Sequence, residues 1–147
     1  MKKTLAIILA VVMMVSLLAG CGDKPAPNPD PAGSSLDVAV FYYDFSDVYI
    51  SSVRNSMNSQ LDALGVKYNN YDGAGNQSQQ TDQINTAIAN GANLLIVNIV
   101  ETSSPDAAQN AVEAAKTAGI PIIFFNREVS DDVVNSYETV SYTHLRA

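Results

Sequence analysis

The 147-residue chain has one cysteine, one histidine and no tryptophan, and only 8 basic residues against 15 acidic ones. A single cysteine excludes an internal disulfide framework, and one cysteine with one histidine excludes most zinc sites by ligand count. The net charge of −7 argues against binding to nucleic acid, whose phosphates require a basic surface. We therefore expect no metal site and no nucleic-acid partner. A chain of this length suits one folded domain.

The amino-terminal segment has the pattern of an export and anchoring sequence. Lys2 and Lys3 precede an apolar run over residues 5–18, which is too short for a membrane-spanning helix and typical of a signal peptide. Cys21 follows small residues, as in a bacterial lipobox. We expect residues 1–20 to be removed and Cys21 to be lipidated, which would anchor the protein outside the cytoplasm; the alternative is a free cysteine after an ordinary signal peptide. Residues 21–35 are proline-rich and predict an extended tether.

The carboxyl-terminal octapeptide VSYTHLRA, residues 140–147, follows no pattern set by the preceding chain. Its codons can be spelled by an adapter used to prepare sequencing libraries. We therefore expect residues 140–147 to be foreign sequence and the natural chain to continue beyond Thr139; the alternative is a genuine frayed terminus. His144, the single histidine, lies in this octapeptide and carries no functional weight.

Between the two ends, apolar runs of strand length alternate with amphipathic stretches of helical length. The pattern predicts strands over residues 36–43, 66–71, 93–100 and 120–125, separated by helices over 48–64, 78–91 and 104–119. Ser104 followed by Pro105 is a typical start for the helix over 104–119, and Ser78 is a candidate cap for the helix over 78–91. This alternation predicts an α/β fold, an open parallel sheet with helices on both faces, over residues 36–139. Ligands of such sheets bind beyond the carboxyl ends of the strands.

Polar and aromatic side chains follow the strands at those carboxyl ends. Asp47, Tyr49, Asn98 and Asn126 are the candidate ligand contacts. Carboxylates and amides form hydrogen bonds with hydroxyl groups, and an aromatic ring packs on the C–H face of a sugar, so a polyol is the expected ligand class. Each residue has a structural alternative. Asp47 could cap a helix, Tyr49 could pack at its start, Asn98 could be hydrogen-bonded within the fold, and Asn126 could simply end its strand.

No motif for catalysis or nucleotide binding stands out. The serines have no evident base partner, and Asp131 with Asp132 is typical of a solvated helix start. Asp72 and Gly73 predict a turn, and Arg127 with Glu128 is interpreted as a surface ion pair. We therefore expect a protein that is not an enzyme and that holds no cofactor.

Four segments together resemble the amino-terminal lobe of periplasmic galactose/glucose-binding proteins, the substrate-binding subunits of sugar ABC importers. They are FYYDFSDVYISSVRNSM (41–57), NQSQQTDQINTAIANGANLLIVNIVE (76–101), AAKTAGIPIIFFNRE (114–128) and NSY (135–137). QTDQIN and FFNRE point to the galactose/glucose branch. The family shares its fold with lac-repressor-type sensor domains.

The resemblance implies a type I periplasmic-binding fold and a role for each candidate residue. Asp47 would accept hydrogen bonds from a sugar hydroxyl, Tyr49 would stack on the pyranose, Asn98 would bond sugar oxygens, and Asn126 would lie beside the site. Family members have a second lobe, which holds their calcium loop and has no counterpart in this chain. The implied partners are a monosaccharide, galactose or glucose, and an ABC permease. The alternative is a ligand-sensing lipoprotein that presents the sugar to a membrane receptor.

Overall fold

The computed structural model describes residues 35–137 and 140–143. The expected signal peptide over residues 1–20, the lipidation site Cys21, nearly all of the tether and His144 lie outside the described residues. Within the described ranges, no helix combines the length and the hydrophobicity needed to cross a membrane.

Strands and helices alternate along the chain in the order that the apolar pattern predicts. The elements are β1 (Asp37–Tyr42), α2 (Val48–Ala63), β2 (Lys67–Asp72), α3 (Gln77–Ala89), β3 (Leu94–Val97), α4 (Pro105–Ala118), β4 (Ile122–Phe125), α5 (Asp131–Val134) and β5 (Val140–Thr143). The strands form one parallel sheet in the order β2-β1-β3-β4-β5, which places the apolar strand β3 at its centre and the more polar β2 at an edge. The predicted α/β fold is confirmed.

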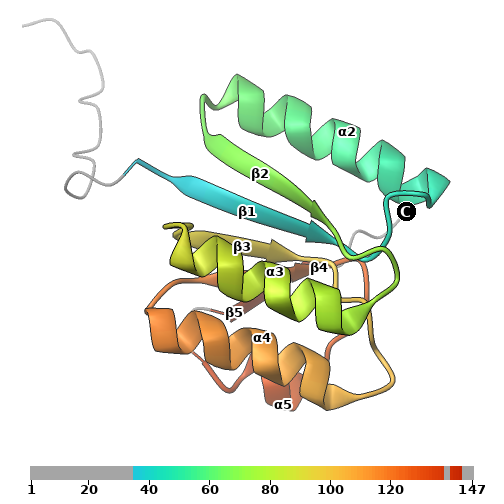
Figure 1. Cartoon of the computed structure of the whole chain (residues 1–147), viewed down its shortest axis with the longest axis vertical. Helices are drawn as coiled ribbons and strands as arrows, with labels where there is room; N and C mark the ends of the chain where they lie inside the picture. The colour runs from blue at the N-terminus through green and yellow to red at the C-terminus, as the bar shows by residue number, and fades with distance from the viewer. Residues whose placement is uncertain (1–34, 138–139, 144–147) are drawn as a thin grey trace, which may run out of the picture. The chain divides into compact units, whose positions relative to one another are not determined.

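Helices cover both faces of this sheet (Figure 1). Alternate residues of β1 point to opposite faces: Val38, Val40 and Tyr42 pack with α2, whereas Ala39 and Phe41 pack with α3 and α4. All five side chains are at most 1% exposed, so both faces of β1 are core. Because the strands are parallel, the loops that follow β1, β2, β3 and β4 all lie at the carboxyl-terminal ends of the strands. We call this end of the sheet the rim.

Helix caps decide where the elements start and stop. Ser104 caps α4 with Pro105 in its first turn, as expected, and Gly119 ends α4 in the left-handed conformation at φ 69°. For α3 the expected cap is wrong. Asn76, not Ser78, is extended and accepts the backbone N–H of Gln79 at 3.1 Å. The side chain of an N-cap residue bonds the amide of the second or third helical residue, and Gln79 is the third residue after Asn76. The helix therefore begins at Gln77, directly after this cap.

The fifth strand, Val140–Thr143, lies in the octapeptide to which the sequence analysis assigns no element. It pairs parallel with β4, with Ile122 opposite Val140 and Phe125 opposite Thr143. Its backbone thus extends the sheet beyond β4. The origin of residues 140–147 is a question about the gene, and the expectation of foreign sequence remains a prediction.

Candidate functional site

The four candidate residues all follow or begin elements at the rim. Asp47 and Tyr49 lie at the start of α2, after β1; Asn98 follows β3; and Asn126 follows β4. The parallel sheet brings these separate segments to the same end. Their side chains, however, are in very different environments.

Asp47 is half-buried and is the N-cap of α2. Its Oδ1 accepts the backbone N–H of Ile50 at 2.9 Å, and its Oδ2 accepts the hydroxyl of Tyr43. The hydrogen bond from Tyr43, followed by that from Ile50, lowers the pKa of the Asp47 carboxyl below its ordinary value. The capping alternative is therefore confirmed. It leaves a ligand role open, because each carboxylate oxygen has a further lone pair to offer.

Tyr49 is 52% exposed, and its neighbour Val48 is 86% exposed. Both lie in the first turn of α2, directly after Asp47. An exposed aromatic ring two residues beyond a charged acceptor can pack on the apolar face of a sugar whose hydroxyl bonds that acceptor. The first turn of α2 therefore combines the two chemistries that sugar binding needs.

Asn98 is fully buried, and the described chain already occupies its side-chain amide. Its Oδ1 accepts the backbone N–H of Tyr43 at 3.2 Å, and its Nδ2 donates to the carbonyl of Phe125 at 3.0 Å. Asn98 thus ties the end of β3 to β1 on one side and to β4 on the other. Of the two alternatives for Asn98, this geometry favours the structural one.

Asn93 makes the same kind of connection at the opposite end of β3. Its Oδ1 accepts the backbone N–H of Asp37 at 2.9 Å, and its Nδ2 donates to the carbonyl of Ser35 at 3.1 Å. Asn93 is half-buried and Asn98 fully buried, so the two asparagines form a matched pair that differs in exposure.

Gln80 is a rim residue that is not among the candidates expected from the sequence. It is fully buried on the inner face of α3; its Nε2 donates to the carbonyl of Asn98 at 3.0 Å, and its Oε1 accepts the N–H of Val100 at 3.0 Å. Gln80 therefore fixes the backbone just after β3. Its spacing is the available signal, since Gln80, Ile84 and Ala87 lie on one helical face and the latter two are apolar.

Arg127 is not the partner of Glu128 in a surface ion pair, as expected from sequence. Its guanidinium carbon lies 3.8 Å from the centre of the Tyr43 ring, and its Nη1 donates to the carbonyls of Ile99, at 3.3 Å, and Val100. Within the described ranges, the one salt bridge joins Lys67 and Asp37. Arg127 points inward because the carbonyls of the segment after β3 and an aromatic ring offer it better partners than an exposed carboxylate does.

Asn126 precedes Arg127 with a left-handed backbone at φ 67°, a conformation that costs energy for any residue other than glycine and that asparagine tolerates best. Its side chain is half-buried, and none of the hydrogen bonds of the described residues involves it. The unusual backbone turns the chain directly after β4. Backbone strain of this kind is concentrated at functional sites. The side-chain amide of Asn126 is available to a ligand.

The predicted turn after β2 is confirmed and closes one side of the rim. Asp72 Oδ1 accepts the backbone N–H groups of Phe45 at 3.0 Å and Ala74 at 2.9 Å. Gly73 packs so closely that an added Cβ would lie 2.8 Å from Val100 Cγ2 and 3.0 Å from the Tyr42 carbonyl oxygen. Only glycine fits between β1 and the segment after β3.

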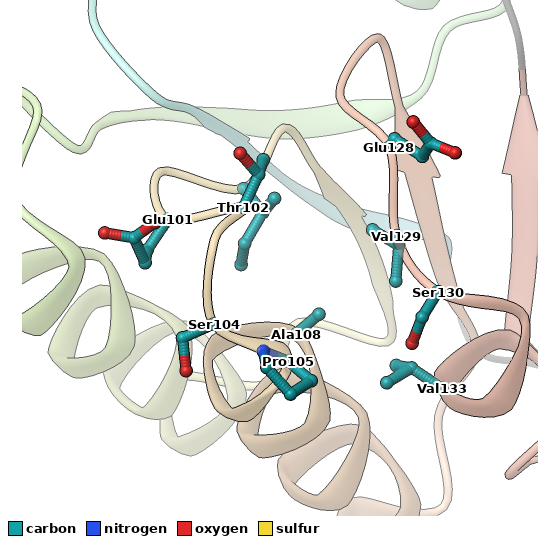
Figure 2. A pocket seen from close by; sticks show the side chains of 10 residues that line it. Glu101, Thr102, Ser104, Pro105, Ala108, Glu128, Val129, Ser130 and Val133 are labelled. Carbon is teal, nitrogen blue, oxygen red and sulfur yellow. The ribbon is translucent and has the colours of Figure 1, made fainter.

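A pocket of about 290 Å³ opens between the segment after β3 and the segment after β4 (Figure 2). Ala108 and Val133 supply apolar walls, and the carboxylates of Glu101 and Glu128 lie on opposite sides and point away from one another. Glu101 is engaged by the backbone N–H and hydroxyl of Ser103, which lower the pKa of its carboxyl. The pocket is not lined by the four candidate residues.

The described ranges contain no group of three or more side chains that could together hold a metal ion. What the rim offers is a charged acceptor, an exposed aromatic ring, an available amide and a rigid backbone. Groups of these kinds are suited to hydrogen bonding and stacking with a hydroxyl-bearing ligand.

Comparison with known proteins agrees with this fold. The chain is 29% identical over 143 residues to the D-galactose/methyl-galactoside binding periplasmic protein MglB of Haemophilus influenzae, covering 97% of this chain and 40% of that protein. It is 23% identical over 140 residues to the ribose import binding protein RbsB of Bacillus subtilis, covering 92% of this chain and 44% of that protein. The chain thus spans less than half the length of either relative.

Solved structures give the same result. A Caulobacter myo-inositol binding protein superposes with a TM-score of 0.61 at 24% identity, covering 80% of this chain and 36% of that one. At this identity the likeness shows the fold alone. A sequence profile described as a periplasmic binding protein domain matches residues 38–143. Because this match includes most of the chain, the protein belongs to the periplasmic binding protein domain family.

Proposed function

We propose that the protein is the amino-terminal lobe of an extracytoplasmic sugar-binding protein that delivers galactose or glucose to an ABC importer. The observation that carries this proposal is the first turn of α2, where the charged acceptor Asp47 lies two residues from the exposed ring of Tyr49. Similarity to a galactoside-binding protein and to a ribose-binding protein supports a monosaccharide as the ligand class.

Three residues make the direct contacts in this proposal. Asp47 accepts a hydrogen bond from a sugar hydroxyl, Tyr49 stacks on the ring, and Asn126 contributes its available amide. Asn98 acts indirectly, since its amide holds the strand ends that carry the other residues. The protein acts by binding and release, without catalysis.

The proposed whole protein is larger than the present chain. A second lobe would supply the other wall of the cleft and close over the sugar by hinge motion, and Cys21 would anchor the protein in the membrane. Sequencing the gene beyond codon 139 tests this part. We expect a reading frame that continues into a second α/β lobe, whereas a natural stop after codon 147 would contradict it. Neighbouring genes for an ATPase and a permease would support transport over the alternative of sensing.

The binding site is tested by NMR on the isotopically labelled chain, titrated with galactose, glucose and ribose. We expect galactose or glucose, at millimolar concentration, to shift the backbone signals of Asp47, Tyr49 and Asn126. Asp47→Asn should weaken this response, and Asp62→Asn, an exposed carboxylate at the far end of the same helix, should not. Sugar-independent spectra at the rim, or an equal effect of both variants, would refute the proposed site.

A further inference from the structure

The rim contains a chain of side-chain contacts that runs from β4 through β1 to α2. Arg127, after β4, stacks on Tyr43, which directly follows β1, and Tyr43 donates its hydroxyl proton to Asp47 at the start of α2. A residue that follows β4 is thereby connected, through Tyr43, to a carboxylate more than 70 residues earlier in the chain. Neither Tyr43 nor Arg127 is among the contacts proposed for the sugar.

Tyr43 is held on two sides before it reaches Asp47. Its backbone N–H donates to Asn98 Oδ1 at 3.2 Å, and the guanidinium carbon of Arg127 lies 3.8 Å from the centre of its ring. Arg127 is itself fixed by the carbonyls of Ile99 and Val100. A planar guanidinium bonded to backbone on one side and stacked on the other gives the tyrosine ring one orientation.

This arrangement determines which way the Asp47 carboxylate faces. Oδ1 is directed toward the N–H of Ile50 and Oδ2 toward the hydroxyl of Tyr43, so the plane of the carboxylate is defined by a donor on each oxygen. One lone pair on each oxygen remains for a ligand. A carboxylate fixed before binding does not lose conformational freedom when a sugar hydroxyl arrives.

From these contacts we infer that Tyr43 is a positioning residue, which orients the carboxylate of Asp47 to accept a sugar hydroxyl, and that Arg127 in turn positions Tyr43. The inference rests on the proposed function for its ligand, but the contact itself is independent of any sugar. Burial does not create the arrangement, since Tyr43 and Asp47 are both only half-buried; the hydrogen bond and the stacking do.

The charges around the pair agree with this assignment. The hydrogen bond from Tyr43 is the largest cause that lowers the pKa of Asp47, and Arg127 adds to it. Around Tyr43, the carboxylates of Asp47 and Asp44 raise the pKa of the hydroxyl, and Arg127 partly opposes them. The hydrogen bond to Asp47 is the largest cause that raises the pKa of the Tyr43 hydroxyl. At neutral pH Tyr43 therefore keeps its proton and is the donor, and Asp47 is the acceptor.

The test removes one oxygen. Tyr43→Phe keeps the ring that stacks on Arg127 and deletes the hydroxyl; Tyr71→Phe, whose ring stacks on Phe41 elsewhere in the core, is the matched control. In the full chain, the carboxyl carbon of Asp47 is followed by NMR through an acid titration. We expect Tyr43→Phe to raise the pKa of Asp47 toward its ordinary value of 3.8 and Tyr71→Phe to leave it unchanged.

The same variants are then titrated with galactose and glucose by NMR. We expect Tyr43→Phe to weaken sugar binding about tenfold with an unchanged melting temperature, and Arg127→Lys, which keeps the charge but not the planar stack, to weaken it less. An unchanged Asp47 titration in Tyr43→Phe would overturn the inference, as would a shifted titration with unaltered sugar affinity. If the wild-type chain bound no sugar while its Asp47 titration responded to Tyr43→Phe, the proposed function would fail and the contact would stand.

Discussion

Replacing Asn98 by alanine should reveal how much of the rim depends on one buried amide. Asn98 is fully buried, and its removal leaves the N–H of Tyr43 without its partner. It also removes one of the two donors to the carbonyl of Phe125, which keeps the N–H of Arg127 at 2.8 Å. An unpaired buried donor costs about 1–3 kcal/mol and the lost hydrogen bond to Phe125 costs about 1 kcal/mol, so Asn98→Ala should lower the free energy of unfolding by about 2–4 kcal/mol. For a domain of this size, that lowers Tm by about 10 °C or more.

Asn93→Ala is the matched control for this experiment. Asn93 bonds the same kinds of backbone groups at the other end of β3, but it is only half-buried, so water can replace its amide. We expect a loss of about 1 kcal/mol or less. Urea unfolding followed by circular dichroism measures both, because the chain lacks tryptophan as a fluorescent probe. Equal losses for the two variants would refute the assignment of Asn98 as the connection between strands.

The remaining predictions concern the cap of α2, the turn after β2 and the affinity of the chain. Because the pKa of Asp47 is lowered in the folded state, its ionised carboxylate stabilises the fold above the ordinary pKa of 3.8, and this stabilisation is lost as the pH falls through the lowered pKa. Asp47→Asn, which still caps the helix, should reduce this acid sensitivity in urea titrations. Asp47→Ala should also destabilise the chain at neutral pH. Gly73→Ala should cost about 1–3 kcal/mol, because its Cβ would lie within 3.1 Å of two backbone carbonyls, and an unchanged Tm would contradict the close approach. Calorimetry should detect no submillimolar binding of glucose or galactose by this chain, if, as proposed, it supplies one wall of a cleft that a second lobe completes; submillimolar binding would contradict the need for a second wall.

Much of the fold can be predicted from the sequence because each element carries its own local signal. The apolar run that contains β3 identifies the central strand, and Ser104 with Pro105 marks the start of α4 within one residue. The start of α3 is less certain, since Asn76 and Ser78 are both acceptable caps and the choice depends on where the turn after β2 ends. Strand β5 is defined by its pairing with β4, which no local pattern reveals.

The site is predicted less completely, because its contacts join residues that are far apart in the chain. Asn98 interrupts an apolar strand, which indicates a special role, but its partners lie 55 residues before it and 27 residues after it. Arg127 beside Glu128 suggests a surface pair, and only the folded sheet brings Tyr43 to the guanidinium. Sequence therefore identifies the segments that form the rim and leaves open whether each polar side chain faces the ligand or the backbone.

The amides of Asn98 and Gln80 and the guanidinium of Arg127 all bond main-chain atoms, which every residue type provides. The framework of the rim is therefore insensitive to which side chains stand at the positions it holds. In the proposed function, ligand preference can then change by substitution at exposed positions, such as 49, with little cost to folding elsewhere. Relatives of this chain are named for a galactoside and for ribose, and a rim whose framework is held largely through main-chain atoms is well suited to such divergence. For the same reason, a library that varies those positions should retain folded members in high proportion and is a practical starting point for a sugar sensor of chosen specificity.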